Sequence, residues 1–331
     1  MTGDAYIYAN ARIAALRSQL LSTAQLELLL SAKTADEAFD ALNGTFLAPY
    51  IARGDRSQLA RMVRKSLSAA KRLIVQIVPD DRPFHVLWMR YDFFNLKTIV
   101  KGRRAQLKDE EILERCFHAA QIAPDRLLAA VDADDVARLD TRLGAAYDAM
   151  RSATHVYDID RASNLGYLQA VAERAQHCRE PFVRDYARRV IDYYNLGTQL
   201  RIASLALDVD PAAVFAPGGT IALSELSSQE AILARYATMD GGPSIWRDAI
   251  ATFTETKNFA VMEKAADDAL LHFITAYPST IESVVGVFAY FIALRNNIQI
   301  VRTIIAGKES GMGEAELRQI VRRVYTVLGD V

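Results

Sequence analysis

Apolar side chains recur every three or four residues along most of the chain, the spacing that places them on one face of an α-helix. In segment 56–78 the apolar residues line one side of such a helix, and the arginines and lysines lie largely on the other. No segment shows sustained alternation of apolar and polar residues, which would indicate a β-strand. The pattern therefore predicts an all-α fold. The predicted helices include 5–22, 35–42, 56–78, 84–103, 162–177, 181–208, 229–238, 258–276, 279–306 and 314–328.

Three of these helices contain related sequences, YDFFNLKTIVKGR, IDYYNLGTQLRI and ALRNNIQIVRTI, which align on Asn95, Asn195 and Asn297. The separations are 100 and 102 residues in a chain of 331. Such a period predicts three pseudo-symmetric repeated helical-bundle domains, each large enough to have its own core. The sequence leaves open whether the repeats stack in a line or close on one another. The predicted domains are 1–118, 119–215 and 216–331.

Each of the three asparagines lies on a helical face, and for Asn95 and Asn297 the rest of that face is mostly apolar. A buried carboxamide must find hydrogen-bond partners, so it can bond to the backbone or to a neighbouring helix and fix the packing register. This interpretation assigns Asn95, Asn195 and Asn297 a structural role. The alternative is direct contact with a partner molecule.

The composition is that of an ordinary globular protein, with 51% hydrophobic and 24% charged residues. A net charge of −1 gives no overall attraction to nucleic acid or anionic lipid. Two cysteines, Cys116 and Cys178, do not suggest a disulfide framework, and a reducing compartment fits better. The N-terminus lacks the apolar core of a signal peptide. The longest apolar run, 284–294, is too short for a bilayer, which needs about 20 residues.

Sequence motifs for catalysis and for metal or nucleotide binding are absent. Segment 307–310, GKES, lacks the upstream glycine and the hydroxyl position of a phosphate-binding loop. The histidines and cysteines do not have the spacing of a zinc site. In each of the three aspartate pairs the two residues are adjacent, whereas a helical Mg²⁺ site would need two carboxylates one helical turn apart. We therefore expect no catalytic residues, no cofactor and no metal. The basic run 53–72 lacks interleaved aromatic residues, so a solvated helix face or a docking surface for an acidic protein fits better than a nucleic-acid site.

Four segments in this order resemble a known family: YANAR at 8–12, YDFFNLKTIVKG at 91–102, GGTIALSEL at 218–226 and IIAGKESGMGEAELRQIV at 304–321. They are similar to the C subunits of bacterial and archaeal V/A-type ATPases, whose eukaryotic relative is the d subunit of the V-ATPase. The resemblance covers essentially the whole chain. The three related segments nevertheless differ, because Gly197 replaces Lys97, and Leu294 stands where the asparagine alignment puts Asp92 and Asp192.

The resemblance implies a non-enzymatic rotor or central-stalk subunit. Members of that family form a funnel of three domains on the cytoplasmic side of the membrane proteolipid ring, and the central shaft enters the funnel. The expected partners are therefore the shaft subunits and the ring, without nucleic acid and without a transmembrane segment. The expected location is peripheral, on the cytoplasmic face of the membrane. The expected role is to transmit torque between ATP hydrolysis or synthesis and translocation of protons or sodium ions.

We call the surface that would bind the shaft the socket. Charged contacts suit such a surface, because it must bind the shaft firmly and still be able to dissociate from it. We therefore predict that basic residues near the ends or polar sides of the related helices are socket residues, with a solvated surface as the alternative for each. The predicted socket residues are Lys97, Lys101, Arg201, Arg302 and Lys308.

Two other functions stay open at this point. One is a helical-repeat scaffold or adaptor unrelated to rotary ATPases, which would explain why no single motif is diagnostic. The other is an all-α enzyme whose site has no familiar motif; a response to substrate analogues or Mg²⁺ in a thermal-shift screen would favour it.

Overall fold

The computed structural model describes residues 6–51, 58–239 and 243–324 of the chain, and within these ranges every regular element is a helix. The predicted all-α fold is thus confirmed. The chain separates into two compact units. Unit 1 consists of Met1–Pro79 and Ser228–Val331, and unit 2 consists of Asp80–Ser227. The three-domain division at 118 and 215, its pseudo-symmetry and its closure into a funnel stay predictions.

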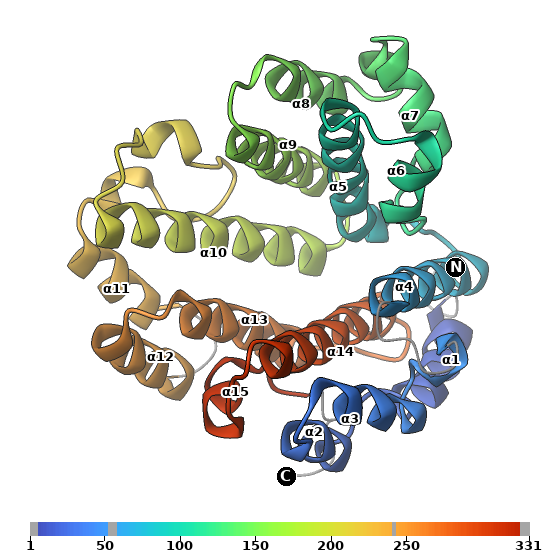
Figure 1. Cartoon of the computed structure of the whole chain (residues 1–331), viewed down its shortest axis with the longest axis vertical. Helices are drawn as coiled ribbons and strands as arrows, with labels where there is room; N and C mark the ends of the chain where they lie inside the picture. Colours follow the sequence, from blue (N-terminus) through green and yellow to red (C-terminus); the bar gives the residue numbers. More distant parts are fainter. Residues whose placement is uncertain (1–5, 52–57, 240–242, 325–331) are drawn as a thin grey trace. The chain divides into compact units, whose positions relative to one another are not determined.

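Unit 1 brings helices from the N-terminal and C-terminal parts of the sequence together around α14, Val285–Glu309. This helix packs against α1, α2, α3, α4, α13 and α15, and Figure 1 shows it in red beside α13. Its buried face contributes Ile300, Val301 and Ile304 to a cluster with leucines of the N-terminal helices. The other α-helices of unit 1 are α1 Ile7–Arg17, α2 Thr23–Ser31, α3 Ala35–Asp40, α4 Leu59–Ile77, α11 Gln229–Ala237, α12 Pro243–Thr256, α13 Phe259–Ala276 and α15 Glu314–Ile320.

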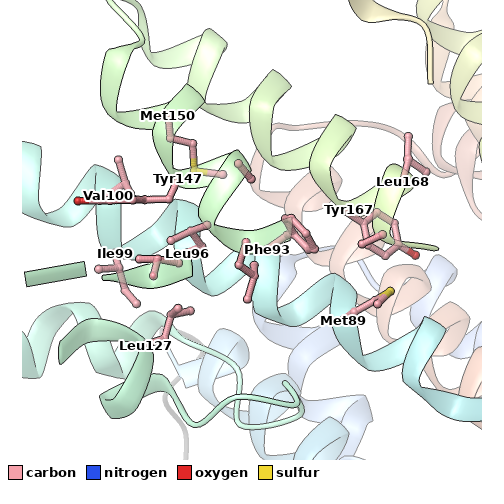
Figure 2. Packing of buried hydrophobic residues seen from close by; sticks show 14 of the residues in the cluster. Met89, Phe93, Leu96, Ile99, Val100, Leu127, Tyr147, Met150, Tyr167 and Leu168 are labelled. Carbon is pink, nitrogen blue, oxygen red and sulfur yellow. The ribbon is translucent and has the colours of Figure 1, made fainter. Parts of the chain in front are cut away.

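Unit 2 is built around α5, His85–Arg104, which lies between α8 and α9 on one side and α6 and α7 on the other (Figure 1). Phe93, Leu96 and Ile99 of α5 are almost fully buried in the main cluster of this unit, part of which is drawn in Figure 2. The other α-helices of unit 2 are α6 Asp109–Arg115, α7 Pro124–Asp132, α8 Thr141–Ser152, α9 Val156–Gln176 and α10 Pro181–Leu205.

Several helix boundaries differ from the sequence prediction, each for a local reason. The predicted 314–328 helix ends at Ile320. Val321 is extended, and the Arg323 N–H donates to Asp268 Oδ1 at 2.9 Å. Residues 325–328 of that prediction lie outside the described residues. The helix α12, which begins at Pro243, is absent from the sequence prediction, although proline is favoured in the first turn of a helix.

Candidate functional site

Asn95 holds the chain that follows α6 against the middle of α5. Its side chain is fully buried, and its two polar atoms bind one residue: Nδ2 donates to Phe117 O at 2.9 Å, and Oδ1 accepts from Phe117 N at 2.7 Å. A carboxamide has a donor and an acceptor side by side, which is the arrangement that a peptide N–H and C=O on the same residue require. The non-helical segment after α6 is therefore fixed at a single register.

Asn195 makes the same pair of bonds from α10. Its Nδ2 donates to Ala216 O at 2.8 Å, and its Oδ1 accepts from Ala216 N at 2.8 Å. Both Asn195 and Ala216 are 0% exposed, so water does not compete for these bonds. We refer to each such arrangement, with Asn95 or Asn195 at its centre, as an asparagine clamp.

A buried aspartate lies one helical turn before each asparagine clamp and binds the same downstream segment further along. Asp92 accepts from Ile122 N at 2.8 Å. Asp192 accepts from Thr220 N at 2.8 Å and from Ile221 N at 3.1 Å. Ionised carboxylates that accept backbone N–H bonds form some of the stronger hydrogen bonds in proteins. These aspartates were missed as site residues from the sequence, although the shared Asp-x-x-Asn spacing was a usable signal.

Asn297 differs from the other two asparagines. It is 0% exposed on α14, but neither Nδ2 nor Oδ1 has a hydrogen-bond partner in the part of the chain that the structure describes. It is therefore buried as its helical face predicts, without the backbone bonds that Asn95 and Asn195 make.

The ends of the three helices show why Asn297 behaves differently. One or two residues after the end of each helix lies a residue with positive φ, and the N–H of the next residue donates to the carbonyl five residues earlier. These bonds run from Leu107 to Gly102, from Leu207 to Ile202 and from Met312 to Gly307. When the three helices are aligned on these ends, Asn297 occupies the position of Asp92 and Asp192. Ile300 then occupies the position of Asn95 and Asn195. This alignment differs by three residues from the alignment on Asn297.

The predicted socket residues Lys97 and Lys101 come together on one carboxylate of α9. Lys97 Nζ lies 3.1 Å from Asp160 Oδ1, and Lys101 Nζ lies 2.8 Å from Asp160 Oδ2. Partial burial works against the charged form of Asp160, but hydrogen bonds from Lys101 and Lys97 outweigh it, so the pKa of this carboxyl group is below its ordinary value. Both lysines are thus engaged in joining α5 to α9 within unit 2.

The remaining predicted socket residues have different surroundings. Arg201 is half-buried on α10 and donates to Gly197 O at 3.3 Å. Lys308 donates to Leu30 O at 2.7 Å, which ties the end of α14 to α2. Arg302, also on α14, is exposed and has no ion-pair partner among the described residues. Of the five residues, the structure brings only Lys97 and Lys101 to a shared partner.

Within the described ranges no group of three or more histidine, cysteine or acidic side chains could hold a metal ion. Cys116 and Cys178 form no disulfide. Among the residues with described positions, no helix has the length and apolar character needed to span a bilayer.

Comparison with known proteins places the chain among components of rotary ATP synthases. It is 24% identical to the C subunit of the A-type ATP synthase of Haloferax volcanii, with 94% of this chain and 96% of the relative aligned. It is 24% identical to the C subunit of the V-type ATP synthase of Deinococcus radiodurans, covering 96% and 92%. For the A-type C subunit of Halobacterium salinarum the identity is 27%, covering 69% and 70%. Residues 9–320 match the family described as ATP synthase (C/AC39) subunit, and the chain therefore belongs to that family.

Proposed function

We propose that this chain is a non-catalytic coupling subunit of a rotary A/V-type ATP synthase. It joins the central shaft to the membrane proteolipid ring, so that torque couples ATP hydrolysis or synthesis to ion translocation. The observation on which the proposal rests is the family match over residues 9–320, together with relatives named as C subunits that align over more than nine-tenths of both chains. An unrelated helical scaffold would not have this match.

The packing of each unit suits a part that transmits torque. Such a part must not deform under load, and close-packed protein interiors have low compressibility. In unit 2 the asparagine clamps and the buried aspartates add to this by fixing the non-helical segments after α6 and α10 at defined registers. A segment bonded at both Asn195 and Asp192 has little freedom to slide along its helix.

The proposal locates the chain on the cytoplasmic face of the membrane, attached through the complex. Under this proposal the chain forms three related domains that close into a funnel around the shaft. These domains are residues 1–118, 119–215 and 216–331. Among the predicted socket residues, Arg302 is the best candidate for a shaft contact because its guanidinium is exposed and has no ion-pair partner within the described chain. Lys97 and Lys101 are weaker candidates because Asp160 already binds both.

A pull-down of the tagged chain from detergent-solubilised membranes tests the proposal. We expect proteolipid and shaft subunits in the eluate. With Arg302→Glu, recovery of the shaft subunits should fall about five- to tenfold at low ionic strength and less in high salt, because charged rim contacts are screened.

Arg247→Glu is the matched control, since Arg247 is an exposed arginine of α12 in the same unit. Its eluate should equal that of the wild type. Absence of both proteolipid and shaft subunits from the wild-type eluate would contradict the coupling function. Equal recovery with Arg302→Glu and Arg247→Glu would contradict only the assignment of Arg302.

A further inference from the structure

The outward face of α4 carries a row of positive charges. Arg61, Lys65 and Arg72 are exposed, and none of the three has an ion-pair partner among the described residues. At 3.6 residues per turn their side chains fall within about 40° of one another around the helix axis. We refer to these three residues as the basic row. The opposite face of α4 is buried in unit 1, where Met62 and Ile74 are almost fully enclosed.

The elements around α4 contain almost no negative charge. The helix itself has five basic residues and no acidic residue. It packs most extensively on α1, on α14 and on the 3-10 turn Ala48–Tyr50. These three elements contain one acidic residue between them, Glu309 at the last position of α14. Since the whole chain has a net charge of −1, the basic row is a local concentration of positive charge.

Such a row weakens the chain on its own. Like charges four residues apart on a helix repel each other, and Arg61 and Lys65 have this spacing. Elsewhere in unit 1 an exposed arginine is neutralised, because Arg318 forms ion pairs with both Glu27 and Glu314. A repulsive row without such compensation in the described part of the chain is typical of a surface that binds an anionic partner.

The geometry of the basic row favours an acidic helix over a lipid surface. A helix that binds lipid inserts its apolar face into the bilayer interface, but the apolar face of α4 lies in the protein core. The three cations are four and seven residues apart, which gives separations of about 6 Å and about 10 Å along the axis. Carboxylates four and seven residues apart on a second helix have the same separations. Val75, one turn beyond Arg72 and 44% exposed, adds apolar area to the same face.

We propose that the basic row of α4 binds an acidic helix of another subunit of the rotary complex. That helix lies along α4 and pairs its aspartates or glutamates, four and seven residues apart, with Arg61, Lys65 and Arg72. This site rests on the proposed coupling function, which supplies the complex. It adds a second surface of unit 1 to the predicted socket residues.

Zero-length crosslinking of the intact complex tests this surface. A carbodiimide joins a lysine amine to a carboxylate only where the two groups are in contact, and Lys65 is the one lysine of the basic row. The complex is purified from detergent-solubilised membranes and analysed by mass spectrometry. We expect Lys65 joined to an aspartate or glutamate in a helical segment of another subunit. The yield should fall about five- to tenfold in about 0.5 M salt, because exposed charge pairs are screened.

Arg61→Gln/Arg72→Gln should lower the yield of the Lys65 crosslink about five- to tenfold, because two of the three charges that hold the acidic helix are removed. Glutamine is a good helix former and both positions are exposed, so the variant should fold. The matched control is Arg126→Gln/Arg247→Gln, which removes exposed arginines from α7 and α12 and should leave the yield unchanged. Equal yields in the variant and the control would refute the pairing.

The composition of the purified complex distinguishes failure of this site from failure of the coupling function. Shaft and proteolipid subunits without a Lys65 crosslink to a helical segment would overturn the site and leave the coupling function intact. Absence of those subunits would contradict both.

Sedimentation of the purified chain with vesicles that contain phosphatidylserine tests the lipid alternative. We expect equally low binding for the wild type and for Arg61→Gln/Lys65→Gln/Arg72→Gln. Binding that the triple substitution abolishes would assign the basic row to lipid and overturn the acidic helix.

Discussion

Replacing Asn195 with leucine is expected to lower the free energy of unfolding of unit 2 by about 2–5 kcal/mol. Leucine has a similar size but no polar atoms, so the N–H and C=O of Ala216 lose both partners at a position that is 0% exposed. Each buried backbone group left unpaired costs about 1–3 kcal/mol. The packing volume changes little, so the effect comes mainly from the two hydrogen bonds.

Urea denaturation followed by tryptophan fluorescence measures this loss. The chain has two tryptophans, Trp88 in unit 2 and Trp246 in unit 1, so a Trp246→Phe background leaves Trp88 as the reporter. The control is Asn164→Leu on α9, an exposed asparagine, which should change stability by no more than about 0.5 kcal/mol. A loss below about 1 kcal/mol for Asn195→Leu would show that Ala216 finds other partners.

Phe93→Ala is expected to destabilise unit 2 by about 3–5 kcal/mol, the cost of deleting a large buried aromatic side chain. Phe93 is 2% exposed, lies within the cluster of Figure 2, and has its ring centroid 6.4 Å from that of Tyr167 on α9. A Cβ placed on Gly166 of α9 would lie only 2.8 Å from Phe93 Cε1. The glycine thus allows α9 to approach the ring closely, and truncation of the ring leaves a cavity between α5 and α9.

The neighbouring residue supplies the control for this substitution. Phe94 lies on the same helix but is 37% exposed, and its ring packs edge-on against Phe117 at 5.0 Å. Phe94→Ala should cost only about 1 kcal/mol. Both variants are measured by urea denaturation in the Trp246→Phe background. Equal losses for the two phenylalanines would contradict the described burial of the α5 face.

The sequence predicted the long helices well because their apolar spacing is strong. The predicted 84–103 and 181–208 helices correspond to α5 His85–Arg104 and α10 Pro181–Leu205. The burial of Asn95 and Asn297 also followed from the mostly apolar helical face on which each lies. Short helices were less predictable. The helix α6, Asp109–Arg115, was missed because seven residues contain too few apolar positions to establish a period.

The surroundings of the candidate site residues depend on contacts between segments far apart in the sequence. Asp160 follows Lys101 by 59 residues, and nothing near either residue indicates their pairing. The alignment on Asn297 stays a prediction, and the helix-end bond from Met312 to Gly307 supports an alternative register that differs from it by three residues. Helical periodicity alone cannot distinguish positions three residues apart, since both fall on the same face.

Ion uptake by inverted membrane vesicles tests the proposed coupling role most directly. In vesicles from cells that lack this chain, ATP-driven ion uptake should fall to background while ATP hydrolysis by the catalytic subunits continues. Expression of the wild-type chain should restore uptake. Uptake that continues at the wild-type rate without the chain would show that torque reaches the proteolipid ring by another route, and would contradict the coupling function.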